Sequence, residues 1–89
     1  MKIKDGFILR KIAGEDIVVP IGGNIANFNG IINLNESAAF LWRELQQDLS
    51  IEELVDKLIK EYEINEEIAS NDAQSFVDIL VQNNVIEGI

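Results

Sequence analysis

The hydrophobic pattern of the chain changes its period once, at Asn35, and this change constrains the fold more than any other feature. Before it, residues 7–12 (FILRKI) and 17–21 (IVVPI) are short, apolar and rich in β-branched side chains, as β-strands are. After it, apolar residues recur every three or four positions, which is the spacing of one helix face. Strands followed by helices, without alternation, predict an α+β domain.

The strand half of the chain predicts a small meander. Ala13-Gly14-Glu15-Asp16 reads as the connection of a hairpin, and Pro20, which has no N–H to donate, is expected near the end of the second strand. The turn formers Asn27-Phe28-Asn29-Gly30 precede a third apolar run, Ile31-Ile32-Asn33-Leu34. This third strand starts there or earlier, near Ile25, and in a meander it lies at an edge of the sheet.

Three amphipathic helices are predicted after the strands. Asn35, Ser50 and Asn65 are placed to cap their starts, and Ser50-Ile51-Glu52-Glu53 matches a capping box. A short extended segment is expected at Val85-Ile86. We therefore predict that residues 1–89 form a single winged helix-turn-helix-like domain, in which a three-stranded antiparallel sheet precedes three helices.

The residue types that are missing exclude much of enzyme chemistry. The 89 residues contain no Cys and no His, so there is no thiolate nucleophile, no Cys-ligated metal and no imidazole base. The acidic pairs Glu52-Glu53 and Glu66-Glu67 fall in first turns of predicted helices, where negative charge is favourable. We expect no catalytic residue, no metal site and no cofactor, and we predict that the protein is not an enzyme.

The charge is unevenly distributed. Residues 1–34 carry four Lys or Arg against three Asp or Glu, whereas residues 35–89 carry three against thirteen, for a net charge of −9. The helical half should repel nucleic acid and anionic membrane surfaces. With no apolar run of signal-peptide or transmembrane length, a cytoplasmic protein is expected.

The segment Leu34-Asn35-Glu36-Ser37-Ala38-Ala39-Phe40-Leu41-Trp42 resembles the LNxxAxxxW signature of the PqqD-like family. The similarity extends through Val18-Val19-Pro20-Ile21-Gly22, the start of the second helix at Ser50, Tyr62, and the ending Phe76 to Ile86, so that it covers roughly residues 7–87. One departure is the connection from Pro20 to Ile31, which is longer and richer in Asn and Gly than the short turn of the family.

The resemblance implies a function as a RiPP recognition element. Members have three strands and three helices, bind the leader segment of a ribosomally made precursor peptide, and hand it to a modifying enzyme, often a radical S-adenosylmethionine protein. Pairing of a peptide with an open sheet edge is a general recognition mode. Carried over to this chain, the resemblance implies that the leader pairs along the third strand: Asn29, Gly30, Ile31, Ile32 and Asn33.

The third helix would form the wall of the groove. Ile68, Asp72, Ser75 and Ile79 share one side of that helix, and we predict that they contact the peptide. They lie beside the expected core stripe of the helix, which consists of Ala69, Ala73, Phe76, Val77 and Leu80. The alternative is that Ile68 and Ile79 simply widen the core stripe. Trp42 is interpreted as a core anchor rather than a ligand-stacking residue.

Two other functions stay open from the sequence. One is a winged-helix regulator that binds DNA, which would require a basic helix face. The other is a protein adaptor that does not recognise a leader. Whether the chain forms a homodimer through the same edge strand is also open.

Overall fold

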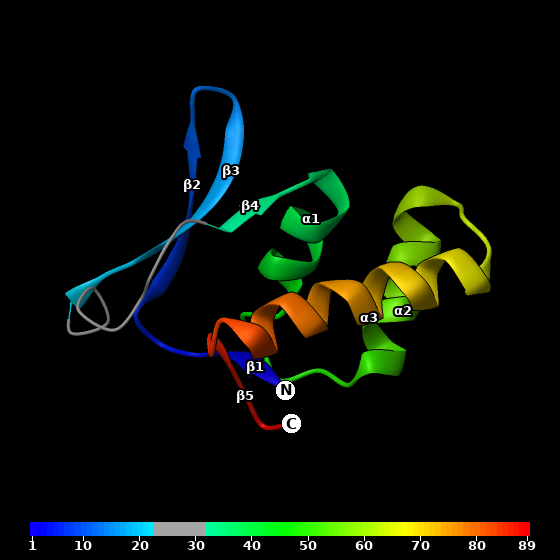
Figure 1. Ribbon diagram of the computed structural model, residues 1–89. Coiled ribbons are helices and arrows are strands. Elements are labelled where there is room, and N and C mark those ends of the chain that lie inside the picture. Colours follow the sequence, from blue (N-terminus) through cyan, green and yellow to red (C-terminus); the bar gives the residue numbers. More distant parts are fainter. Residues whose placement is uncertain (23–31) are drawn as a thin grey trace.

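The computed structural model describes residues 1–22 and 32–89 of the chain. It confirms the predicted fold class: a three-stranded antiparallel sheet in the order β2-β3-β4 is followed by three helices (Figure 1). The strands of this sheet are β2 (Phe7–Ile12), β3 (Glu15–Pro20) and β4 (Ile32–Leu34), and the helices are α1 (Glu36–Glu44), α2 (Ile51–Tyr62) and α3 (Glu66–Gln82). The β2–β3 hairpin projects from the helices as a wing (Figure 1).

The turn of the hairpin is tighter than the sequence predicted. Ile12 pairs with Glu15, so the connection consists of Ala13 and Gly14 alone, and the predicted four-residue connection was wrong. Both residues have positive φ, +52° for Ala13 and +82° for Gly14, as a two-residue turn that matches the twist of its strands requires. This turn is difficult to predict from the sequence because alanine rarely adopts the left-handed conformation. The expected end of the second strand at Pro20 is confirmed.

A second, two-stranded sheet joins the two ends of the described chain. β5 (Ile86–Glu87) lies where an extended segment was predicted, and it pairs with β1 (Lys2–Ile3), which was not predicted. The N–H of Ile3 also donates to the carbonyl of Leu45 at 3.0 Å. The N-terminal residues are thereby held against the start of the α1–α2 connection and against β5.

The three predicted helix caps are confirmed. The Asn35 side chain accepts from the N–H of Ala38, and the Asn65 side chain accepts from the N–H of Ile68, each at 2.9 Å. Ser50 and Glu53 form the complete capping box, with each side chain accepting from the backbone N–H of the other residue at 3.1 Å. These caps satisfy amides that a helix start leaves without intrahelical partners.

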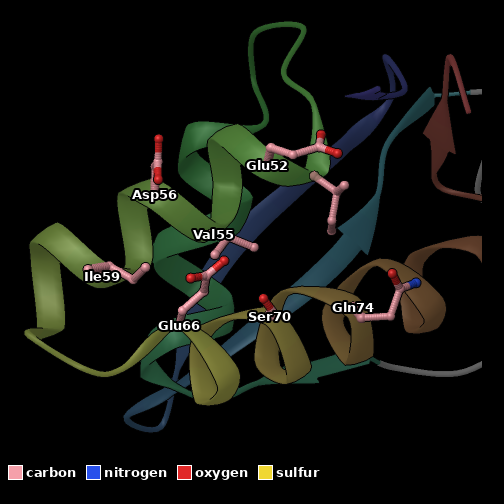
Figure 2. Close-up of a pocket in the computed structure, with 8 residues that line it drawn as sticks. Glu52, Val55, Asp56, Ile59, Glu66, Ser70 and Gln74 are labelled. Carbon is pink, nitrogen blue, oxygen red and sulfur yellow. The ribbon is translucent and has the colours of Figure 1, made fainter.

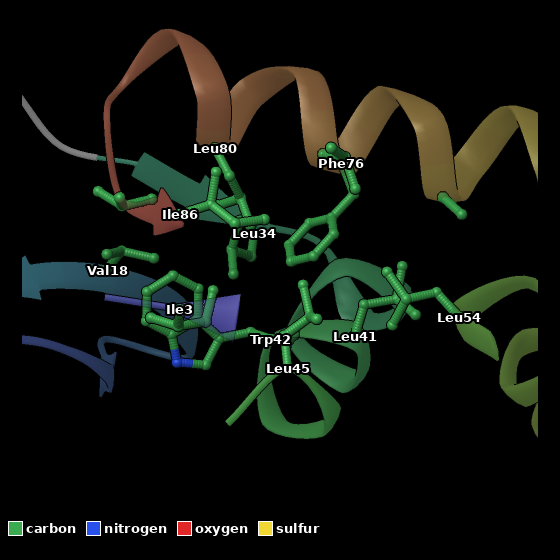
Figure 3. Packing of buried hydrophobic residues seen from close by; sticks show 14 of the residues in the cluster. Ile3, Val18, Leu34, Leu41, Trp42, Leu45, Leu54, Phe76, Leu80 and Ile86 are labelled. Carbon is green, nitrogen blue, oxygen red and sulfur yellow. The ribbon is translucent and has the colours of Figure 1, made fainter. Parts of the chain in front are cut away.

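The hydrophobic core lies where the sheet, α1 and α3 meet (Figure 3). Phe76 and Leu80 of α3 point toward Leu41, Trp42 and the strand residues below them (Figure 3). Trp42 is 2% exposed, which confirms its assignment as a core anchor. The expected stripe of α3 is fully buried and consists of Ala69, Ala73, Phe76, Val77 and Leu80.

Across residues 1–22 and 32–89, no helix combines the length and the apolar character needed to cross a membrane.

Candidate functional site

In the part of the chain that the structure describes, β4 is an edge strand of the three-stranded sheet. β4 pairs with β3 through Ile32 opposite Val18, Asn33 opposite Ile17 and Leu34 opposite Asp16, and in the described sheet it has no other neighbour. In an antiparallel pair, successive residues direct their N–H and C=O groups alternately toward the partner and away from it. Among residues 1–22 and 32–89, the outward N–H and C=O groups of β4 therefore have no strand partner, and such an edge can pair with a further strand.

Two of the five predicted edge residues can be placed. Ile32 and Asn33 belong to β4, whereas Asn29, Gly30 and Ile31 lie outside the described residues, as does an earlier start near Ile25. The side chains of Ile32 and Leu34 are buried, and that of Asn33 is exposed. β4 is thus fixed in register by its apolar side chains, while its backbone stays at the edge.

The predicted wall residues of α3 are exposed side chains rather than parts of the core. Ile68 is 47% exposed and Ile79 is 40% exposed, and Asp72 and Ser75 between them are exposed as well. The alternative that the two isoleucines widen the core stripe is therefore wrong. Half-exposed isoleucines on a helix flank leave apolar surface that a partner can cover.

These four residues line two adjoining hollows between α3 and the start of α1. Ile68 and Asp72 line the first, of about 340 Å³, and Asp72, Ser75 and Ile79 line the second. Both hollows also include the residues that directly follow β4, namely Asn35 and Ser37. Together the two hollows are called the α1–α3 groove below, and they bring all four predicted wall residues to one surface.

Several residues of the α1–α3 groove were not predicted. Asn35 and Ser37 come from the start of α1, and Tyr62 and Ile64 from the end of α2 and the turn that follows it. Asn35 was recognised as a helix cap, but its place in the groove depends on how α1 packs against α3. No local pattern in the sequence could have indicated that packing.

The described lining of the α1–α3 groove is negative and includes no basic residue. Asp72 and Glu36 are its charged groups. Tyr62 closes one end, where its hydroxyl donates to the carbonyl of Glu36 at 3.5 Å and its ring meets Phe40 edge to face. Burial, with a further contribution from the Glu36 carboxylate, raises the pKa of Tyr62 above its ordinary value, so the hydroxyl stays protonated near neutral pH.

The arrangement has the features of a peptide-binding surface. In the described part of the chain, no three acidic side chains gather in a way that could hold a metal ion. The groove offers half-covered apolar side chains, one central carboxylate and an adjacent strand edge. Main-chain pairing and side-chain pockets together are the means by which proteins recognise extended peptides.

The fold and the open edge define a class: small winged-helix-like α+β domains in which a short edge strand lies beside a helix-lined groove. The profile of one family, described as Coenzyme PQQ synthesis protein D (PqqD), matches residues 7–86. The chain belongs to the PqqD family. A comparison with curated proteins finds no match.

Two solved structures have the same fold. One is described as TbiB1 in complex with the TbiA(beta) leader peptide, with a TM-score of 0.76, 22% sequence identity, and coverage of 100% of this chain and 98% of that chain. The other is described as lasso peptide synthetase B1 complexed with the leader peptide, with a TM-score of 0.70, 18% identity, and coverage of 92% and 91%. At these identities the likeness establishes the fold.

Proposed function

We propose that this protein is a non-catalytic peptide-binding domain that recognises the leader segment of a ribosomally synthesised precursor peptide. The leader would add a strand to the outer edge of β4 and place its side chains in the α1–α3 groove. The observation that carries the proposal is the coincidence of an open strand edge with exposed Ile68 and Ile79 on the adjacent helix. The two solved structures with the same fold were both determined with leader peptides, which supports this choice of ligand.

The groove suggests what kind of leader would fit. Side chains on one face of a strand recur at every second residue. Apolar side chains on that face of the bound leader would cover Ile68 and Ile79. A Lys or Arg between them would lie near Asp72. Because the groove is exposed, this attraction would raise the rate of association more than the affinity, and it would weaken as salt rises.

The bound leader would be presented to a modifying enzyme. We place this encounter in the cytoplasm, where the precursor is synthesised, and we infer an enzyme partner of the radical S-adenosylmethionine type from the family resemblance. A homodimer that pairs β4 with β4 would use the same edge, so it would compete with the leader. The peptide proposal therefore predicts that added leader dissociates any such dimer.

DNA binding is not favoured by the charges on the helices. α3 carries Glu66, Glu67, Asp72 and Asp78 and no Lys or Arg. α2 offers Lys57 and Lys60 among four acidic residues. A helix that enters a DNA groove needs a basic face to offset the charge of the phosphates, and neither helix has one.

The proposal can be tested by titrating the isotope-labelled domain with leader segments of short precursors encoded beside its gene. Chemical-shift changes should concentrate on β4 and on the α3 flank at Asp72 and Ser75, with saturable binding. A scrambled peptide of equal composition is the control. Absence of saturable binding to every such peptide, or changes confined to β2 at the opposite edge of the sheet, would overturn the proposal.

Strand pairing itself can be tested in the peptide, without altering the protein. N-methylation of single leader residues removes one backbone donor at a time. In a strand that pairs on one side, only alternate N–H groups face the partner, so affinity should fall at every second position. A uniform effect along the peptide would show that the leader does not bind as a strand.

A further inference from the structure

A second groove runs between α2 and α3. It has a volume of about 390 Å³, and its described lining residues all come from these two helices: Ile51, Glu52, Val55, Asp56, Ile59, Glu66, Ser70 and Gln74 (Figure 2). Val55 of α2 and Glu66 of α3 face one another across it (Figure 2). None of these residues lines the α1–α3 groove.

The α2 side of the α2–α3 groove carries an apolar ridge. Ile51, Val55 and Ile59 follow one another at four-residue intervals, so they form one ridge along α2. They are only partly buried, in contrast to Leu54 and Leu58 on the inner side of the same helix. The ridge spans about 12 Å, or a little more than two helical turns.

The rim of this groove is acidic. Glu52 and Asp56 stand along the α2 side and Glu66 on the α3 side, and no Lys or Arg belongs to the lining. All three carboxylates are on exposed residues. An apolar strip between negative charges of this kind complements a ligand that has an apolar face flanked by positive charge.

The two grooves lie on opposite flanks of α3. Glu66 and Ser70 line the α2–α3 groove, whereas Ile68 and Asp72, two positions further along, line the α1–α3 groove. Two positions correspond to a rotation of about 200° around a helix. A ligand in one groove therefore leaves the other accessible.

The walls also limit the conformation of an occupant. Both are helices, whose backbone N–H and C=O groups are bonded internally except at their ends. An extended peptide would find no strand edge to pair with here, whereas a helix satisfies its own backbone and can bind through side chains alone.

We propose that the α2–α3 groove is a docking site for a positively charged amphipathic helix of a protein partner. Apolar residues of that helix at positions i, i+3, i+4 and i+7 would pack on Ile51, Val55 and Ile59. Its flanking Lys and Arg side chains would lie beside Glu52, Asp56 and Glu66. A second copy of this chain is a poor occupant, because the net charge of −9 and the wholly acidic charged residues of α3 would repel each other across the rim.

The test uses two synthetic helical peptides of the same length. Both carry Leu at i, i+3, i+4 and i+7, and the remaining positions are Lys and Ala in one peptide and Glu and Ala in the other. The full chain is labelled on its Ile and Val methyl groups. We expect the Lys peptide to shift the methyl signals of Ile51, Val55 and Ile59 saturably, and the Glu peptide to leave them unchanged.

Two charge-reversal variants make the test specific. Asp56→Lys lies on the rim and should weaken binding of the Lys peptide about three- to fivefold, because it removes an exposed ion pair and puts a like charge in its place. Glu15→Lys in the distant β2–β3 hairpin changes the net charge equally and should leave the affinity within about twofold. Circular dichroism should confirm that both variants fold.

Four results would overturn the proposal. They are a lack of saturable shifts at the three ridge residues, equal weakening by Asp56→Lys and Glu15→Lys, shifts centred on Ile68 and Ile79 instead, and concentration-dependent shifts of the same methyl groups without any peptide. The last would identify a second copy of the chain as the occupant. Binding of a leader peptide should leave the Lys-peptide affinity unchanged, so failure of leader binding and failure of this site are separate results.

Discussion

Truncating the two exposed isoleucines of the α1–α3 groove provides the most direct test of peptide recognition. Ile68 and Ile79 are 47% and 40% exposed, so a bound peptide could cover a little under half of each. Full burial of an isoleucine side chain is worth about 1.5–3 kcal/mol. Alanine keeps part of the covered surface, so the Ile68→Ala/Ile79→Ala variant should lose about 1–2 kcal/mol of binding free energy, which raises Kd about 5- to 30-fold.

The measurement is a titration of fluorescently labelled leader peptide, followed by anisotropy at fixed salt concentration. Two control variants remove apolar surface of similar exposure outside the groove: Val81→Ala on the same helix, at 49%, and Ile12→Ala in the hairpin, at 48%. Neither should change Kd more than about twofold. Thermal unfolding should show that each variant is folded at the assay temperature.

A further variant covers the case in which the double substitution destabilises the fold. Ser75 is exposed and lines the groove, so Ser75→Lys fills the groove without removing packed atoms. It should weaken binding while the unfolding midpoint stays within a few degrees. If both groove variants bind as tightly as the wild type, or if the controls lose as much affinity, the peptide does not contact this flank of α3.

Four further predictions concern the α1–α3 groove, the cap of α2, the core and the hairpin turn. Asp72→Lys should weaken binding of a leader that carries a basic residue and reduce the salt dependence of its association rate, measured by stopped-flow mixing; an unchanged salt dependence would contradict the assigned role of the carboxylate. Ser50→Ala should cost about 1 kcal/mol in urea denaturation, because it removes the side chain that caps α2, and a loss below a few tenths would contradict this. Leu54→Ala, at a fully buried position, should cost about 2–5 kcal/mol in the same assay, and a cost like that of an exposed residue would be inconsistent with the packing. Ala13→Asn should raise the unfolding midpoint, since asparagine tolerates the left-handed conformation that Ala13 adopts, and a lower midpoint would refute that reasoning.

Local sequence patterns predicted the helices well because their determinants are local. Each helix starts at the expected Asn or Ser cap, and the buried stripe of α3 matches the apolar residues spaced three and four apart. The strands were predicted less accurately. The turn at Ala13 uses a conformation that alanine seldom adopts, and β1 consists of two residues whose partners lie at the far end of the chain, so no short window could reveal it.

One side of the candidate site, the flank of α3, could be predicted from the sequence. The flank of α3 follows from helical periodicity, and the structure places Ile68, Asp72, Ser75 and Ile79 along the two adjoining hollows. Their contact with a peptide stays a prediction. The opposite side of the groove, at Asn35 and Tyr62, comes from the packing of α1 and α2 against α3, which depends on contacts distant in sequence.

The pairing of β1 with β5 has a kinetic consequence. Ile3 is 3% exposed, yet the strand it belongs to is completed by residues about eighty positions away. Closing so long a loop is entropically costly, and during synthesis the pairing must wait until Ile86 and Glu87 have left the ribosome. We therefore expect Ile3→Val to accelerate unfolding about fivefold at a cost of about 1 kcal/mol, with little change in the folding rate. The helices would pack first, and β1 would pair with β5 only after they have packed.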